Sequence, residues 1–219
     1  MVQSNTENMS EGYSKTVQWL VWGFLAIVIA VIAGLFVFKT VINPPAKLPV
    51  YNQVAEFTLT NQLGGRVTLA SLRGNVWVAN IIFTRCAGPC PKLTAQTRQL
   101  QDRIPRDLPV KLVTLTTDPE YDSPQVLKMY ANRNGADPNR WYFLTGSKAE
   151  IVKLAVDGLK LTRVEKKPEE RDNDVDLFIH STIWVLVDKR GQLRATFEST
   201  DPEAAAKILS DIHQLIEER

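Results

Sequence analysis

The sequence predicts an α/β domain that follows a single membrane-spanning helix. Two observations support this prediction. Residues 19–38 form an apolar run of twenty residues without a charge, and from about Tyr51 onward short apolar runs alternate with amphipathic segments. The first pattern is long enough to cross a bilayer, and the second is typical of strands and helices that alternate around a sheet. The net charge of +2, with no basic block and no glycine-rich phosphate loop, excludes nucleic acid as a predicted partner.

Residues 19–38 are predicted to be a retained transmembrane anchor. At about 1.5 Å per residue the run spans roughly 30 Å, the thickness of the hydrocarbon core of a bilayer. Trp19 and Trp22 lie at one end, as interfacial aromatic residues do. A cleaved signal peptide would need a shorter apolar core and a small-residue cleavage site, whereas this run ends in the bulky residues 36–38. The flanking charges are too balanced to set the orientation of the chain.

The segments around the anchor divide the rest of the chain. Residues 1–18 are polar and are expected to be disordered. Residues 39–50 contain three prolines and are expected to form a stiff linker. Residues 51–219 are long enough for one domain with its own core.

The first part of this domain is predicted to lead into a buried central strand and a helix. Residues 54–60 alternate in polarity and predict a strand, which the glycines at 64–65 turn into a second strand at 66–69. Residues 76–83 are almost continuously apolar, as a strand buried on both faces is. The proline at position 91 suits the first turn of a helix that extends to about residue 103.

The middle of the domain repeats this alternation. Residues 110–116 form the next apolar run and are predicted to be a strand. A Ser-Pro pair then begins a helix over residues 123–134, and residues 141–144 form a short strand. Ser147 and Glu150 have the spacing of a capping box for a helix that ends at about residue 157.

The last part of the domain is predicted to be a hairpin and a helix. Residues 160–176 are dense in charges of both signs and are expected to form an exposed loop. Residues 182–187 predict a second buried strand, which an Arg-Gly turn joins to a strand at 192–197, and residues 202–217 form an amphipathic helix. A strand–helix–strand unit followed by a hairpin and a helix is typical of a thioredoxin-like fold, and it places the cysteines of this chain at the carboxyl edge of the sheet.

Cys86 and Cys90 are the only cysteines, and three residues separate them. Both thiols can approach one soft metal ion, or each other. Since a disulfide across so short a loop removes little chain entropy, a metal or redox role is predicted over a structural bridge. Two thiolates favour copper(I). Cys90 adjoins the start of a predicted helix, whose dipole is expected to lower the pKa of this thiol.

His180 and His213 are the only histidines. His213 lies among polar residues of the last helix and is interpreted as a surface residue. His180 stands before the second buried strand, which the strand order brings near the cysteines. An isolated histidine is usually structural, but beside a cysteine pair we predict that His180 is the third ligand of a copper site.

Several motifs, taken in order, resemble the Sco/SenC family of copper chaperones. The similarity extends over most of residues 52–217 and includes the anchor. No single motif is decisive, but their order and spacing together are specific. The motifs are FTRCAGPCP at 83–91, DPEYDSP at 118–124, FLTG at 143–146, HS at 180–181 and LVDKRG at 186–191.

The resemblance implies a metal-transfer protein rather than a conventional enzyme. Cys86, Cys90 and His180 would bind copper(I) and would also accept copper(II). The protein would assist assembly of the binuclear copper centre of cytochrome c oxidase. Partners would be the copper-bearing oxidase subunit and other copper chaperones or thiol reductants. The domain would face the periplasm, or the intermembrane space in a mitochondrion. Asp118 and Asp122 are interpreted as turn-forming and helix-capping residues.

Two positions depart from the family pattern, and three other functions stay open. Ala87 stands where proline is usual, and Phe178 where tyrosine is common, but neither change removes a ligand. A thiol–disulfide oxidoreductase on the same fold would act on cysteines of the oxidase subunit, although thioredoxins use Cys-x-x-Cys and a cis-proline, and residues 176–185 contain no proline. A peroxiredoxin needs threonine three residues before its cysteine, where this chain has Phe83 or Ala87. A tethered binding module would need no metal.

Overall fold

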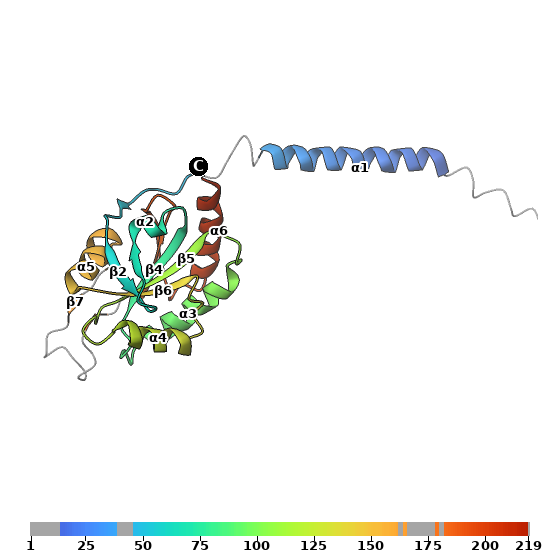
Figure 1. The fold of residues 1–219 in the computed structure, drawn as a ribbon. Coiled ribbons are helices and arrows are strands. Elements are labelled where there is room, and N and C mark those ends of the chain that lie inside the picture. Colours follow the sequence, from blue (N-terminus) through green and yellow to red (C-terminus); the bar gives the residue numbers. More distant parts are fainter. Residues whose placement is uncertain (1–13, 39–45, 162–163, 166–177, 180–181, 219) are drawn as a thin grey trace, which may run out of the picture. The chain divides into compact units, whose positions relative to one another are not determined.

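The computed structural model describes residues 14–38, 46–161, 164–165, 178–179 and 182–218 (Figure 1). The chain divides into two compact units, residues 1–47 and residues 48–219. The first contains helix α1 (Ser14–Val37). Its segment from Val17 to Val37 is long and apolar enough to cross a membrane, which supports a single membrane span. Helix α1 begins within the segment predicted to be disordered, and the rest of that segment, residues 1–13, lies outside the described residues.

In the described part of the second unit, eight strands form one mixed sheet in the order β1-β10-β9-β4-β5-β6-β2-β3. Strands β4, β5 and β6 are parallel, and every other pair of neighbours is antiparallel. Short strands β7 (Val164–Glu165) and β8 (Phe178–Ile179) pair separately. The strands of the main sheet are β1 (Asn52–Gln53), β2 (Thr58–Asn61), β3 (Arg66–Thr68), β4 (Val76–Ile82), β5 (Val110–Thr116), β6 (Trp141–Thr145), β9 (Ile183–Val187) and β10 (Gln192–Glu198).

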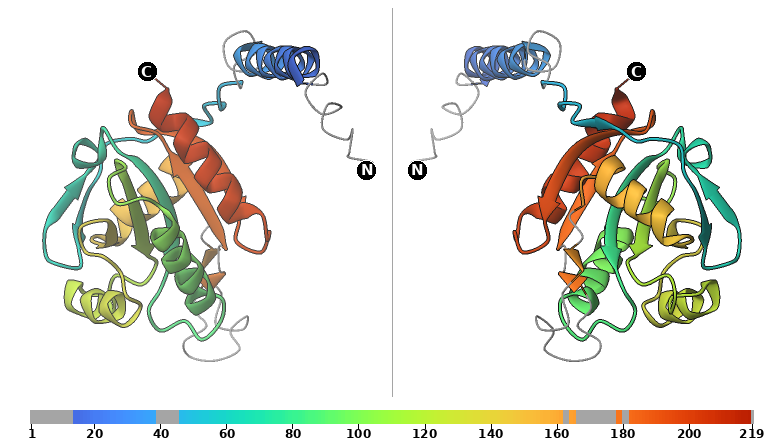
Figure 2. Two further views of the ribbon diagram at one scale, coloured as in Figure 1. Left: turned by 90° about the vertical axis from the view of Figure 1, so that its right-hand side faces the viewer. Right: turned by 90° about the vertical axis from the view of Figure 1, so that its left-hand side faces the viewer.

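Helices cover both faces of this sheet, so the unit has three layers (Figure 2). All seven residues of β4 are buried, because alternate side chains pack into a core on either side. One core contains α3 (Cys90–Arg103), α4 (Pro124–Arg133) and α6 (Ala204–Glu217). The other contains α2 (Leu69–Leu72), α5 (Lys148–Val152) and the π-helix η2 (Lys153–Gly158). The predicted thioredoxin-like α/β pattern is confirmed.

Three predicted elements differ from the structure. The strand predicted at 54–60 is correct only from Thr58 onward: β1 pairs with β10 and β2 with β6, and Val54 and Phe57 are buried in the core between these strands. Leu69 begins helix α2 instead of ending a strand, because Thr68 and Ser71 form a capping box. The helix predicted to end at about residue 157 changes from α to π geometry at Lys153.

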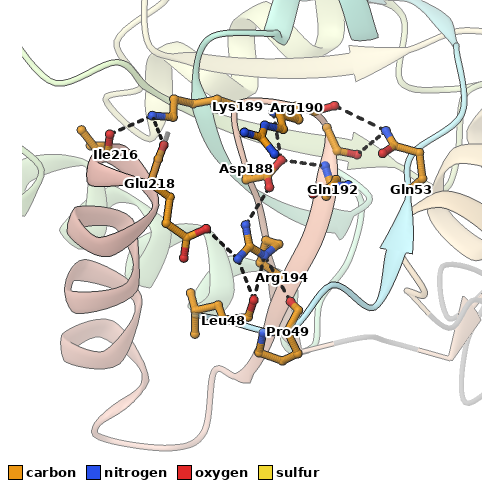
Figure 3. A network of polar contacts seen from close by, with 11 residues as sticks. Leu48, Pro49, Gln53, Asp188, Lys189, Arg190, Gln192, Arg194, Ile216 and Glu218 are labelled. Carbon is orange, nitrogen blue, oxygen red and sulfur yellow. Dashed lines mark hydrogen bonds and ion pairs between the residues drawn. The ribbon is translucent and has the colours of Figure 1, made fainter. Parts of the chain in front are cut away.

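Arg194 fastens the beginning of the second unit to its end (Figure 3). Its side chain is 6% exposed, and its Nη1 and Nη2 donate to Asp188 Oδ2 and Glu218 Oε2, each at 2.8 Å. Nη2 also donates to the Leu48 carbonyl at 2.6 Å, and Nε to the Pro49 carbonyl at 3.2 Å. We call these five residues the arginine clasp. The compact unit therefore begins at Leu48, within the predicted linker.

The arginine clasp lies at the amino end of β4. Strand β9 runs antiparallel to β4 and pairs Val187 with Trp77, so the turn after β9 adjoins the start of β4. The cysteine loop follows the other end of the same strand. Seven residues at about 3.3 Å each place the clasp and the loop roughly 20 Å apart.

Candidate metal centre

The two cysteines meet where β4 gives way to α3. Strand β4 ends at Ile82, Cys86 lies in the connecting loop, and Cys90 is the first residue of α3. Both side chains are buried thiols, not joined in a disulfide, and they hydrogen-bond to each other. The prediction that the thiols approach each other at the carboxyl edge of the sheet agrees with this geometry.

The thiol of Cys90 is harder to ionise than the sequence predicts. Its hydrogen bond with Cys86 raises the pKa of Cys90 most, and burial raises it further. The expectation that the start of α3 would lower this pKa is therefore wrong. The hydrogen bond with Cys86 and the loss of contact with water both raise the pKa of Cys90. Together they outweigh the lowering that the helix dipole would cause.

Asp122 holds the beginning of the cysteine loop. Its carboxylate is fully buried and accepts a hydrogen bond from the backbone N–H of Thr84 at 3.1 Å. It also accepts from the hydroxyls of Thr84 and Thr116. Burial raises the pKa of Asp122, and these three donors oppose the rise.

Asp118 holds the next residue of the loop. Its Oδ2 accepts from Arg85 Nη2 at 2.6 Å, and the Arg85 guanidinium lies 4.3 Å from the ring centroid of Tyr121. The interpretation of these aspartates as helix caps is wrong, because Ser123 Oγ accepts from the Val126 N–H at the start of α4. Their backbone does form the predicted turn, but their side chains fix the cysteine loop.

A hydroxyl pair joins the helices beside the thiols. Tyr130 of α4 lies 2.9 Å from Thr94 of α3, oxygen to oxygen. Thr94 follows Cys90 by one helical turn, so both face the same side of α3. Burial raises the pKa of Tyr130, and both cysteines add to the rise. No pattern in the sequence predicts this pair, because Thr94 and Tyr130 lie on different helices.

His180, the predicted third ligand, lies outside the described residues. Strand β9 runs antiparallel to β4, so its first residue, Ile183, lies at the sheet edge where the cysteine loop begins. Among the residues that the structure describes, no three His, Cys, Asp or Glu side chains are grouped to hold a metal. His213 is exposed on α6, as interpreted.

Comparison with known proteins identifies the relatives of this arrangement. The model of the SCO1/SenC family matches residues 46–217. The chain belongs to the SCO1/SenC family. A SCO1 protein homolog of Bacillus subtilis is 34% identical over 168 residues, which cover 76% of this chain and 84% of the relative.

Two solved structures of the family have the same fold. The structure of BsSco, a member of the Sco family of cytochrome c oxidase assembly proteins in which a disulfide switch was identified, is 31% identical with a TM-score of 0.68. The match covers 80% of this chain and 100% of that chain. Bradyrhizobium japonicum ScoI, solved with copper bound, is 25% identical with a TM-score of 0.61, and covers 75% and 99% of the two chains.

Proposed function

We propose that this protein is a membrane-anchored copper chaperone. It binds one copper ion through Cys86, Cys90 and His180, and it assists assembly of the binuclear copper centre of cytochrome c oxidase. Residues 19–38 anchor it, residues 39–50 link the anchor to the domain, and the domain acts on the extracytoplasmic side. The contact between two buried thiols at the carboxyl edge of the sheet is the observation that carries this proposal.

The chemistry of the two thiols fits copper better than a hard metal ion. Sulfur donors are soft and favour copper(I), whereas magnesium and calcium take oxygen ligands. The thiol of Cys90 is protonated when metal-free, because its pKa is raised, so loading releases its proton. Asp122 and Asp118 hold Thr84 and Arg85, and thereby keep Cys86 beside Cys90 while copper enters or leaves.

The choice of copper as the metal and of the oxidase as its recipient is based on the relatives. ScoI of Bradyrhizobium japonicum was solved with copper bound, and BsSco is described as an oxidase assembly protein. The partner is accordingly the copper-bearing subunit of the oxidase, with other copper chaperones or thiol reductants acting before it.

Anaerobic titration of the reduced full chain with copper(I) tests the proposal. We expect one tightly bound copper per chain, lost in Cys86→Ser and in Cys90→Ser and weakened at least tenfold in His180→Ala. His213→Ala is the matched control, since it removes the other histidine from an exposed position. Full stoichiometry and unchanged affinity in His180→Ala would exclude this histidine, and no uptake by the unmodified chain would exclude the chaperone function.

The same thiol contact also favours a thiol–disulfide oxidoreductase. Two thiols that share a hydrogen bond are placed to form a disulfide as they reduce a partner's cysteines, with two electrons and two protons passing to that partner. Steady disulfide turnover by metal-free His180→Ala protein would favour this second function. Absence of turnover would leave metal transfer.

A further inference from the structure

A groove of about 230 Å³ lies between α3 and the loop that joins β10 to α6. Its α3 wall is a stripe of four polar side chains at helical spacing, which places them on one face of the helix. The buried side chains of Leu100 and Trp184 also line it. The stripe consists of Lys92, Gln96, Gln99 and Arg103, and the opposite wall consists of Ser199, Thr200, Asp201, Pro202 and Ala205.

Gln96 joins the two walls of this groove. Its Nε2 donates to the Ser199 carbonyl at 2.9 Å. Its Oε1 is buried and has no hydrogen-bond partner in the described part of the chain. The bond to Ser199 holds the loop against α3 and so keeps the groove in shape.

The unbalanced charge of the groove is positive. Lys92 and Arg103 are exposed, and neither forms an ion pair with any described residue. Asp201, the acidic residue among those that line the groove, already pairs with Lys207 at 3.1 Å, a lysine that it shares with Glu203. The groove therefore complements a ligand with negative charge near Lys92 and near Arg103.

The two basic residues also set the length of the ligand. They are eleven residues apart on α3, or about 16 Å at 1.5 Å per residue. An extended chain covers this distance in about five steps of 3.3 Å. Side chains of an extended chain alternate between its two faces, so two acidic side chains face the same wall only at an even spacing. A seven-residue segment with an acidic residue at each end has this spacing and spans both charges.

We propose that this groove docks an extended acidic segment, about seven residues long, of the protein that exchanges metal with Cys86 and Cys90. Lys92 lies in the first turn of α3, the helix that Cys90 begins, so the docked segment ends at the end of the helix that carries this thiol. The identity of the partner as a metal carrier rests on the proposed function. The docking itself requires no metal.

Fluorescence anisotropy of a labelled peptide tests this docking with the metal-free full chain in phosphatidylcholine nanodiscs. The probe is a seven-residue peptide with glutamate at both ends and alanine and serine between, and its counterpart has glutamine at both ends. We expect the glutamate peptide to bind and the glutamine peptide to bind at least tenfold more weakly. The double variant Lys92→Gln/Arg103→Gln should weaken binding of the glutamate peptide at least tenfold.

The control is Lys128→Gln/Arg133→Gln, which removes the same charge from exposed positions on α4. Equal losses in both double variants, or no binding by the unmodified chain, would overturn the proposal. If the chain binds phosphatidylglycerol vesicles through Lys92 and Arg103 and does not bind the peptide, the proposal is overturned in favour of a membrane surface. Because no copper is present, these outcomes are independent of the titration that tests the proposed function.

Discussion

The two ends of strand β4 are held by charged groups of opposite sign. At the amino end, the buried cation of Arg194 is neutralised by Asp188 and Glu218 and also binds two backbone carbonyls. At the carboxyl end, the buried carboxylate of Asp122 is held by three neutral donors and forms no ion pair with a described residue.

This difference separates a fixed end of the domain from an adjustable one. Removal of one member of a buried ion network leaves an uncompensated charge and costs much stability. The arginine clasp therefore connects Leu48–Pro49, the β9–β10 hairpin and Glu218 only while all its charges are present. Neutral hydrogen bonds to Asp122 can be exchanged one at a time at smaller cost. The end that carries the thiols can therefore adjust as a ligand arrives, whereas the other end stays in place.

The largest effect should come from Arg194→Met. This change leaves the buried carboxylate of Asp188 and the half-buried carboxylate of Glu218 without a cation. We expect the free energy of unfolding in urea to fall by about 3–5 kcal/mol. Lys207→Ala is the control, because it removes a cation whose side chain is 53% exposed. It should lower the free energy of unfolding far less than Arg194→Met does. Equal losses in the two variants would show that the clasp contributes no more than a surface pair.

A smaller effect is expected from Asp122→Ala. The N–H of Thr84 and two hydroxyls lose their acceptor, which should lower the free energy of unfolding by about 2–3 kcal/mol. Copper affinity should fall as well, because the loop before Cys86 loses its support. In Arg194→Met, by contrast, the folded fraction should bind copper normally. A loss of copper affinity in Arg194→Met alone would reverse the assignment of the fixed and adjustable ends.

The smallest expected effect is a pH dependence of stability at the carboxyl end. The pKa of Asp122 in the folded state is raised above the ordinary value of 3.8. At a pH between 3.8 and the raised pKa, the folded state therefore binds more protons than the unfolded state. The contribution of Asp122 to the free energy of unfolding should therefore fall as pH rises through this window. Asp122→Asn should abolish that component. A difference between the two proteins that is constant from low to neutral pH would contradict the raised pKa.

Patterns within a few residues predicted most of the fold. Strand β5 has the predicted bounds, because a continuous apolar run needs no knowledge of distant residues. The meeting of Cys86 and Cys90 was predictable for the same reason, since three intervening residues limit their separation. The error over residues 54–57 arose where Val54 and Phe57 are buried outside a strand, so polarity alternation no longer reports strand geometry.

Contacts between distant segments were not predictable. Thr84 and Asp122 are 38 residues apart in the chain, and Arg194 and Leu48 are 146 apart. The pKa of Cys90 was predicted in the wrong direction, because the sequence suggests a helix dipole but does not reveal the burial and the shared proton that oppose it. His180 stays a prediction.

The arginine clasp fixes the distance between the start of the domain and its thiols. Because the clasp holds Leu48 and Pro49 at the end of β4 opposite the sulfur atoms, the folded domain adds roughly 20 Å to the radius within which those sulfurs can act. A flexible extension of equal length would have to lose chain entropy at each encounter, and a folded sheet does not. The distance from Leu48 to the sulfur atoms is thus set by a folded strand.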